Sequence, residues 1–480
     1  MLIRFNHARR SKLTAISLTF DEMKLRQLFF LFTFFAFTIS CKKTSFITTP
    51  DALLFTSTDT LHFDTVFTGT GSITQSFKIF NLNDQKLLIS NIQLAGGNNS
   101  SFKINVDGSP GTNFSNIEIA PNDSIYVFVA ANINQNVTNL PFLVQDSLQI
   151  SYNDNIHWVQ LDAYGQNAHF LRNAIVTKDT SWNSDLPFVI LGTLTIDQNK
   201  TLTITKGVHV YCHADAKIII NGSLHISGEN HGRVIFSGDR LDDYYTDLPG
   251  SWKGIVFSES SGVNLINYTE IKNAQNALTA NGPSNDYTAK LNLNGCIISN
   301  ALRSGISANH SSINAVNCLI YNCGNNILIT SGGHYNFTNC TVAGYSTNFV
   351  SHSNPVLTVS NTDSLNQAFP LSANFVNSIF YGEEGIVGDE VVVQQTGNTS
   401  FTLNFENDLY KGNTPIGDFV NCIQNADPLF VNIDAAKNEF DFHLQSNSPC
   451  VNTGKNISAA TDLDENFRDL HPDIGCYEWQ

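Results

Sequence analysis

Charged residues are scarce in this chain of 480 residues, since only 14% are Asp, Glu, Lys or Arg. Methionine occurs only twice, and the long runs of Ala, Glu, Lys and Leu that build helical proteins are missing. Gly, Asn, Ser and Thr recur throughout instead. This composition favours many short strands joined by turns over a helical protein. The length allows two or three domains with a sizeable buried core.

Basic residues are also outnumbered, with 26 Lys and Arg against 42 Asp and Glu and a formal net charge of −16. An acidic surface repels phosphate backbones, so nucleic acid is not expected as a partner, and solubility alone also accounts for such a charge. No CxxC pair or Cys/His cluster has zinc spacing. Asp462, Asp464 and Asn466 begin like a calcium loop, but no Gly or distal Glu follows at EF-hand spacing. We therefore predict no metal and no cofactor.

The N-terminus contains no apolar run long enough to be read as a membrane span. Lys24 and Arg26 precede a short apolar stretch at residues 28–39, and Cys41 follows almost directly. This order is typical of a secretory signal peptide. Small residues before a Cys resemble the lipobox of bacterial lipoproteins, although Thr38 stands where that motif usually has Leu.

The lipobox resemblance implies that residues 1–41 are an upstream extension plus a lipoprotein signal peptide, and that Cys41 is lipidated. An ordinary cleaved signal peptide is the alternative. Lipid on Cys41 would make the membrane a partner without a spanning helix. Lys42 follows the Cys rather than Asp, which favours the outer membrane, with its periplasmic or surface face left open. Residues 42–50 form a polar tether.

Residues 51–168 alternate apolar and polar residues in short bursts separated by turn dipeptides. The pattern predicts a β-sandwich and resembles the immunoglobulin-like modules that precede repeat domains in bacterial surface proteins. Such modules usually space or support, and nothing catalytic stands out here. The predicted strands are residues 60–67, 76–80, 87–92, 124–129 and 147–152.

From residue 172 to 480 the strands become shorter and an internal repeat emerges. The equivalent positions are Thr269, Cys296, Cys318, Cys340 and Ser378, at spacings of 27, 22, 22 and 38. Two residues later come Ile271, Ile298, Ile320, Val342 and Phe380, and four residues later come Asn273, Asn300, Asn322, Gly344 and Gly382. The first two columns share one side of a strand and are predicted to stack inward, thiols included. The third accepts the left-handed backbone of a sharp turn. Short coils of this kind must stack on one another, which predicts an all-β solenoid.

Three stretches resemble bacterial right-handed parallel β-helix proteins of the pectin-lyase-like superfamily. They are residues 206–224, residues 236–255 with Trp252-Lys-Gly-Ile255, and the series from Asp427-Pro-Leu to Asp473-Ile-Gly-Cys-Tyr-Glu478. The resemblance implies a right-handed parallel β-helix at a cell surface, and it says little about reaction type. It also implies that residues 427–480 form a C-terminal capping module, in which Asp462, Asp464, Arg468 and Asp473 tie down the last coil.

A secreted protein meets an oxidising environment, in which its cysteines can form disulfides. Cys450 and Cys476 share the last segment, so one disulfide between them is predicted, although spacing does not fix connectivity.

Catalytic carboxylates are missing where enzymes of this superfamily would need them. Polysaccharide lyases require a base and hydrolases require paired carboxylates on one lateral face. The outward positions of the repeat supply one Glu and one Lys; they are Glu270, Lys272, Ile297, Ser299, Leu319, Tyr321, Thr341, Ala343, Ile379 and Tyr381.

The best candidate polar site is one loop in which carboxylates stand beside aromatic residues that can stack on sugar rings. Its residues are Asp239, Arg240, Asp242, Asp243, Tyr244, Tyr245 and Trp252. The alternative is a solvated loop in which Arg240 pairs with a local Asp and the aromatic rings cover the helix.

Together these features favour a lipid-anchored envelope protein. Its β-helix would be a non-catalytic scaffold that binds a polysaccharide or a surface protein. The alternatives are a polysaccharide-active enzyme, a lyase more than a hydrolase, working at the Asp239–Trp252 loop, and a structural component with no ligand.

Overall fold

The computed structural model describes residues 45–136, 141–283, 288–457 and 460–480, and nearly all of its regular structure is β-strand. The predicted signal peptide, Cys41 and the start of the tether lie outside the described residues, so their assignment stays a prediction. Within the described ranges, no helix combines the length and hydropathy needed to cross a membrane.

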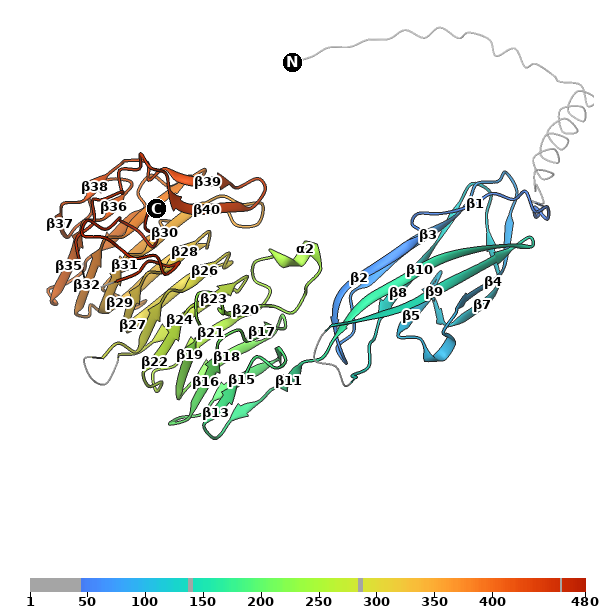
Figure 1. Ribbon diagram of the computed structural model, residues 1–480, viewed down its shortest axis with the longest axis horizontal. Helices are drawn as coiled ribbons and strands as arrows, with labels where there is room; N and C mark the ends of the chain where they lie inside the picture. Colours follow the sequence, from blue (N-terminus) through green and yellow to red (C-terminus); the bar gives the residue numbers. More distant parts are fainter. Residues whose placement is uncertain (1–44, 137–140, 284–287, 458–459) are drawn as a thin grey trace, which may run out of the picture.

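The first domain is a β-sandwich, as the alternating sequence predicted. Its strands in the described chain form two sheets, with orders β1-β3-β8-β5-β6 and β2-β10-β9-β4-β7, around a shared apolar core (Figure 1). The strands are β1 (Leu54–Thr56), β2 (Thr60–Phe67), β3 (Thr74–Asn81), β4 (Leu87–Leu94), β5 (Phe102–Val106), β6 (Ser109–Gly111), β7 (Asn113–Ile119), β8 (Ser124–Ala131), β9 (Phe142–Tyr152) and β10 (Asn155–Gln166). Alternate residues such as Ile125, Val127 and Val129 are buried, as a two-residue period requires.

The second domain is the predicted parallel β-helix. In the described residues its strands form one sheet of 11 strands and one of 17, all paired in parallel. The 11-stranded sheet contains β11 (His169–Arg172), β14 (Phe188–Leu191), β17 (His209–Cys212), β20 (Val234–Gly238), β23 (Thr269–Lys272), β26 (Ile297–Ser299), β28 (Leu319–Tyr321), β30 (Thr341–Tyr345), β33 (Ile379–Glu383), β36 (Leu409–Tyr410) and β38 (Ile423–Gln424). The solenoid begins with β11, just before the boundary predicted at residue 172.

The 17-stranded sheet supplies the other sides of each coil. Its strands are β12 (Ile175–Val176), β13 (Thr180–Trp182), β15 (Thr193–Ile196), β16 (Thr201–Thr205), β18 (Lys217–Ile220), β19 (Ser223–Ser227), β21 (Gly254–Phe257), β22 (Asn264–Asn267), β24 (Asn276–Asn281), β25 (Leu291–Asn294), β27 (Ser304–Val316), β29 (Asn325–Thr338), β31 (Leu357–Ser360), β32 (Leu371–Val376), β34 (Val391–Gln394), β35 (Phe401–Glu406) and β37 (Asp418–Val420).

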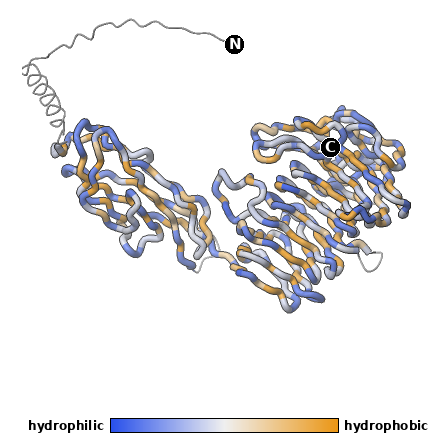
Figure 2. Tube along the Cα trace, turned by 180° about the vertical axis from the view of Figure 1, so that it is seen from behind, coloured by the Kyte–Doolittle hydropathy of each residue, from blue (hydrophilic) through white to orange (hydrophobic). Residues whose placement is uncertain are grey.

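The inward columns of the predicted repeat are confirmed. Ile271 pairs with Ile298, Ile298 with Ile320, Ile320 with Val342, and Val342 with Phe380. These side chains are fully buried, and Cys296, Cys318 and Cys340 are buried beside them as one stack inside the coil. Figure 2 shows the same arrangement as hydrophobic segments that recur from coil to coil. The thiols therefore act as small apolar core residues.

The predicted turn column is confirmed for three positions and wrong for two. Asn273, Asn300 and Asn322 have φ values of 62°, 53° and 51°. Gly344 and Gly382 instead lie inside β30 and β33.

Gly344 and Gly382 provide space for a neighbouring side chain and do not form a turn. A Cβ atom on Gly344 would lie 2.5 Å from His352 Nδ1, and one on Gly382 would lie 2.5 Å from His352 Nε2. His352 in turn contacts Glu390 at 2.8 Å, with both side chains almost fully buried. The glycines therefore make room for a buried polar pair.

A second asparagine column escaped the sequence prediction. One residue before the inward position, the backbone is left-handed at Asn317, Asn339, Asn377, Asn407 and Asn421. Neighbouring members bond directly, as Asn377 Nδ2 donates to Asn339 Oδ1 at 3.0 Å. Asparagine tolerates this conformation and its amide joins one coil to the next.

The C-terminal module covers the side of the solenoid, from the coil of Asn230 to the last coils. Two antiparallel strands, β39 (Phe430–Asp434) and β40 (Glu439–Leu444), pair with each other outside the coil. The module packs on outward residues of the 11-stranded sheet, and this second core contains Leu319, Ala343, Tyr345, Ile379, Tyr381, Leu409, Phe430, Phe442, Leu444, Cys450, Leu463, Ile474, Cys476 and Tyr477.

Hydrogen bonds show how far from the last coil this module reaches. Asn317 Nδ2 donates to the carbonyl of Thr461 at 2.7 Å, and Asn230 Nδ2 donates to that of Asp464 at 2.9 Å. Inside the module, Asp462 accepts backbone bonds, and the Arg468 guanidinium pairs with Glu478 at 3.1 Å in a buried site. These residues tie the module together, and it is held along several coils rather than at the last coil alone.

The predicted disulfide between Cys450 and Cys476 is not formed, and both thiols are free and buried. Cys476 N donates to Thr341 Oγ1 on β30, whereas Cys450 N donates to Ser448 Oγ within the module. The two residues thus serve different packing contacts, and burial raises the pKa of each thiol to about 12.

A small apolar cluster joins the two domains. Phe67 of β2 meets Ala168 and Val189, with Tyr211 and Leu241 against them. The Phe67 and Tyr211 rings lie 4.9 Å apart. The predicted candidate loop begins at this junction, because Leu241 belongs to it.

Candidate functional site

The candidate loop is an insertion between β20 and β21 of the solenoid. It carries the short helix α2 (Asp243–Thr246), which protrudes from the coil toward the sandwich (Figure 1). Backbone bonds from Tyr245 N and Thr246 N to the carbonyl of Asp242 close its single turn. The insertion therefore brings its polar residues to the boundary between the domains.

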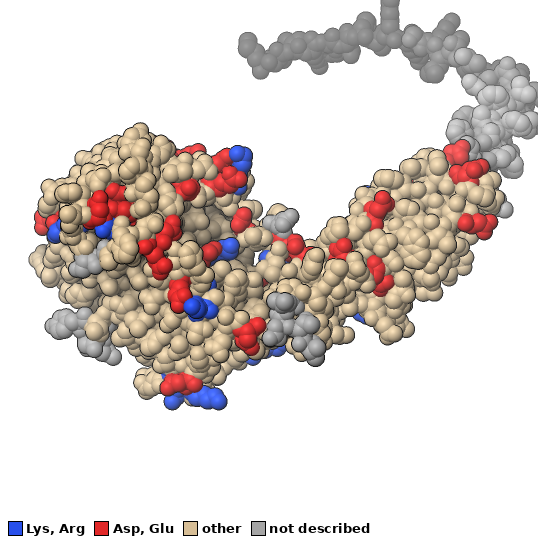
Figure 3. All heavy atoms as spheres, viewed as in Figure 1, with Lys and Arg blue, Asp and Glu red and all other residues tan. Residues whose placement is uncertain are grey.

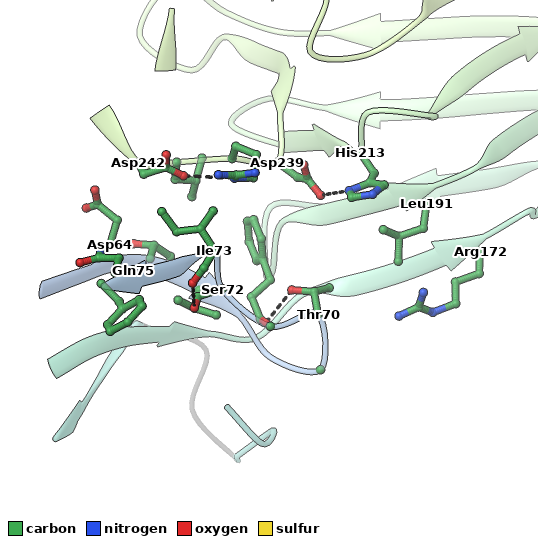
Figure 4. A pocket seen from close by; sticks show the side chains of 18 residues that line it. Asp64, Thr70, Ser72, Ile73, Gln75, Arg172, Leu191, His213, Asp239 and Asp242 are labelled. Atoms are coloured by element: carbon green, nitrogen blue, oxygen red, sulfur yellow. Dashed lines mark hydrogen bonds and ion pairs between the residues drawn. The ribbon is translucent and has the colours of Figure 1, made fainter. Parts of the chain in front are cut away.

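A cleft of about 460 Å³ lies between this loop and the sandwich. From the sandwich it is lined by the end of β2 and the turn that follows, including Asp64, Thr70, Ser72 and Gln75. From the β-helix it is lined by Arg172, Leu191, His213, Asp239, Arg240, Leu241 and Asp242. Figure 4 shows residues of both domains projecting toward the same space.

Asp239 forms the most buried polar contact of the cleft. Its carboxylate lies 2.7 Å from His213 Nδ1, and its side chain is 12% exposed against 49% for His213. Burial raises the pKa of the Asp239 carboxyl, and the hydrogen bond and charge of His213 only partly oppose that shift. An imidazole paired with such a carboxyl can orient a hydroxyl group or accept a proton from it.

Arg240 is held by two neighbours in the same loop. Its Nε lies 3.2 Å from Asp242 Oδ2, and its guanidinium lies over the Tyr245 ring at 3.8 Å from the centroid. This is the local pairing that the sequence left open as an alternative. The stacked guanidinium still lines the cleft, where its remaining N–H groups can donate to a ligand.

The rest of the predicted site divides into residues at the loop and one in the core. Tyr244 is 66% exposed and meets Tyr245 edge-on at 5.0 Å. Asp243 begins α2, and its side chain lies outside what the structure describes.

Trp252 was wrongly predicted as a ligand-binding residue. It is fully buried, donates from Nε1 to the carbonyl of Lys272 at 3.0 Å and stacks on Phe236. The sequence placed it close to the loop, but the chain re-enters the coil before reaching it.

Sequence reasoning missed the other half of the cleft. His213 comes from the turn after β17, and Thr70, Ser72 and Gln75 come from the sandwich. No local pattern marks them, because they meet the loop only when the two domains are joined.

Among the described residues, no group of three or more His, Cys, Asp or Glu side chains gathers in a way that could hold a metal ion. Acidic residues are spread over the face shown in Figure 3, with fewer basic residues among them.

Comparisons with known proteins add little to this site. No known protein family matches the sequence, and no curated protein matches it either. One solved structure with local similarity is a family 123 glycoside hydrolase from Clostridium perfringens, described for the hydrolysis of glycolipid glycans. The identity is 12% and the TM-score 0.17, and the match covers 23% of this chain and 26% of that chain. A likeness this slight carries no argument about function.

Proposed function

We propose that this protein is a lipid-anchored envelope scaffold that binds a glycan, without cleaving it, in the cleft between the sandwich and the β-helix. The single observation that carries the proposal is the cleft itself. The cleft combines the Asp239–His213 pair, the stacked guanidinium of Arg240, and hydroxyl and amide groups from the sandwich. Converging polar groups of this kind suit a ligand rich in hydroxyl groups.

The covered side of the solenoid supports binding at the junction. On the outward face of the 11-stranded sheet, Leu319, Ile379 and Tyr381 are at most 5% exposed and offer no room for a ligand. The C-terminal module occupies that face. The cleft is a place where the β-helix and a second domain jointly offer polar groups to solvent.

The experiment uses the full chain and tests anchor and ligand separately. For the anchor, Cys41→Ser should move the protein from the membrane fraction to the supernatant. For the ligand, affinity electrophoresis measures retardation by gels containing xylan, mannan, β-glucan, polygalacturonate or alginate. Arg240→Ala and Asp239→Asn should each weaken the affinity about tenfold, the effect of losing one charge-assisted hydrogen bond.

Matched controls separate the cleft from general surface effects. Lys200→Ala changes a basic residue in a turn of the β-helix that does not line the cleft. Retardation should be unchanged in that variant. The binding proposal is wrong if no gel retards the wild type, or if the two cleft variants migrate like the control.

A lyase is the second candidate, because the Asp239–His213 contact resembles the pairing of a base with the group that orients it. Incubation of the purified chain with the same polysaccharides separates the two ideas. Shortened polysaccharide products that are absent with the His213→Ala variant would favour an enzyme over the binding proposal. Intact polysaccharides would support binding.

A further inference from the structure

The outer face of the sheet β2-β10-β9-β4-β7 carries a row of amide side chains that ends at an exposed indole. Register places Asn113 beside Gln93, Gln93 beside Gln149, and Gln149 beside Trp158. The row therefore crosses four neighbouring strands. Trp158 is 43% exposed, so its ring is open to solvent at the end of the row.

The amides hold one another in place and keep bonding capacity in reserve. Gln93 Nε2 donates to Gln149 Oε1 at 2.9 Å, and Asn91 Nδ2 donates to Gln93 Oε1 at 2.9 Å. Each amide offers two donors and an oxygen with two lone pairs, so these bonds use only part of the set. Pre-positioned amides can exchange hydrogen bonds with the hydroxyl groups of a ligand at a small cost in side-chain entropy.

A shallow depression of about 480 Å³ continues this face past Trp158. It is lined by Thr60, His62, Gln145, Asp146, Gln160, Leu161 and Asp162. His62 Nδ1 lies 2.7 Å from the Asp162 carboxylate across β2 and β10, and Asp146 adds a second carboxylate to the depression. A face of amides, hydroxyls and carboxylates favours an uncharged ligand over an anionic one.

The same face leads toward the cleft. On β2, His62 lines the depression and Asp64 lines the cleft, and Gln75 of the cleft donates to the carbonyl of His62 at 2.7 Å. A bulge in the β2–β10 pairing lies at Asp64. In Figure 4, Asp64 and Gln75 lie together on the sandwich side of the cleft. The surface is thus continuous from Trp158 to the domain junction.

We propose that this surface is a second glycan-binding site, a platform that takes an extended chain of an uncharged polysaccharide along β10 toward the cleft. Trp158 stacks on the flat face of a sugar ring, and its neighbours Gln149 and Gln160 bond hydroxyl groups of the chain. The direction of the bound polysaccharide toward the cleft rests on the proposed function. The ligand class and the binding residues of the platform do not depend on it.

The opposite face of the sandwich supplies a matched control. There Tyr126 is 45% exposed and stacks on Phe128 at 5.6 Å, with Lys78 over the Tyr126 ring. This face has an exposed aromatic ring of similar accessibility, but a cation rather than a bonded row of amides lies beside it.

The test is affinity electrophoresis of the full chain in gels containing uncharged xylan, mannan or β-glucan, and in gels with anionic polygalacturonate or alginate. We expect retardation by at least one uncharged polysaccharide. Trp158→Ala should weaken it roughly tenfold, with a smaller loss in Gln160→Ala. Tyr126→Ala should bind as the wild type does. Both aromatic positions are exposed, and unfolding curves will check that each variant remains folded.

Several outcomes would overturn the platform. The first is that no uncharged polysaccharide retards the protein, and the second is that only the anionic ones do. The third is an equal loss of affinity in the Trp158→Ala and Tyr126→Ala variants. The two proposals fail separately. If Arg240→Ala binds normally while Trp158→Ala does not, the cleft is wrong and the platform stands, and the converse result rejects the platform alone.

Discussion

Large outward side chains are covered by another segment on the β-helix, whereas on the sandwich they remain exposed to solvent. On the solenoid, Tyr381 points away from the coil core yet is only 5% exposed, because the C-terminal module lies over it. On the sandwich, Trp158 and Tyr164 alternate outward from β10 in the same way, and they remain 43% and 52% exposed. Strand periodicity thus sets which way a side chain points, whereas only the rest of the chain decides whether it is covered.

This contrast bears on function. An outward ring that another segment covers contributes to stability, and its loss leaves a cavity. An outward ring left in water contributes little to stability and is available to a ligand.

Two tryptophans give the sharpest form of the comparison. Trp252 is fully buried in the β-helix, so Trp252→Ala should lower the free energy of unfolding by about 3–5 kcal/mol. Trp158→Ala should change it by less than about 0.5 kcal/mol, because the ring is partly in water already. Denaturant unfolding measures both.

Thiol exposure can follow that transition in the β-helix alone. Every described cysteine lies between Cys212 and Cys476, and burial raises the pKa of thiols such as Cys323 to about 12. Apart from the half-buried Cys422, the thiols of the coil should react with a thiol reagent only once the coil opens. A shift in the Trp158 variant as large as in the Trp252 variant would contradict the distinction between covered and open rings.

The C-terminal module that covers the side of the solenoid is held by a buried ion pair. Arg468 pairs with Glu478 at 3.1 Å where both side chains are at most 6% exposed. Arg468→Ala leaves a buried carboxylate without its charge partner, which should cost about 3–5 kcal/mol of local stability. Limited proteolysis should then cut within residues 430–480, while the sandwich stays intact.

Lys437→Ala is the control for that experiment. Lys437 pairs with Asp434 at 2.7 Å on the same module, but its side chain is 68% exposed. Exposed ion pairs contribute little, so the protease pattern should match the wild type. Equal sensitivity of the two variants would mean that the module is not held by its buried pair.

The smallest effect concerns pH. His443 lies between Asp441 at 2.6 Å and Asp464 at 3.0 Å, and its ring stacks on Tyr477. Burial lowers the pKa of His443, but the bonds and charges of the two carboxylates outweigh it and raise the pKa above its ordinary value. Protonation therefore favours the docked module.

The sign of the pH dependence follows from that shift. The contribution is complete below about pH 6.5, the ordinary pKa of histidine, and is lost as the pH rises through the raised value. Because the ring is 39% exposed, solvent screening should keep it under about 1 kcal/mol. Protease protection of residues 430–480 should fall from pH 6 to pH 8 in the wild type, and His443→Gln should not show this change. Protection that rises with pH would reverse the assignment.

Much of the fold could be predicted because its causes are local or lie one coil away. The two-residue alternation placed β2 at residues 60–67, as the structure has it. The spacing of 22 between Cys296 and Cys318 predicted neighbouring rungs, since residues one coil apart stack directly. The second asparagine column was equally visible, as Asn317 and Asn339 each precede a stacked Cys, but it was overlooked.

The candidate site was only half predictable. The sequence indicated Asp239, Arg240 and Asp242, which do line the cleft, but it could not indicate Ser72 or Gln75 on the other wall. It also included Trp252, whose place in the core depends on where the inserted loop rejoins the coil.

By itself, the sequence determined that this chain builds a sandwich followed by a stacked coil, with thiols and branched aliphatic side chains facing inward. Burial of those side chains follows from spacing along the chain. Tertiary structure alone decided that the C-terminal module covers the side of the solenoid, and that the sandwich and the inserted loop enclose a cleft. Those contacts join residues as distant as Asn230 and Asp464, and they depend on the shape of surfaces that exist only after each domain has folded.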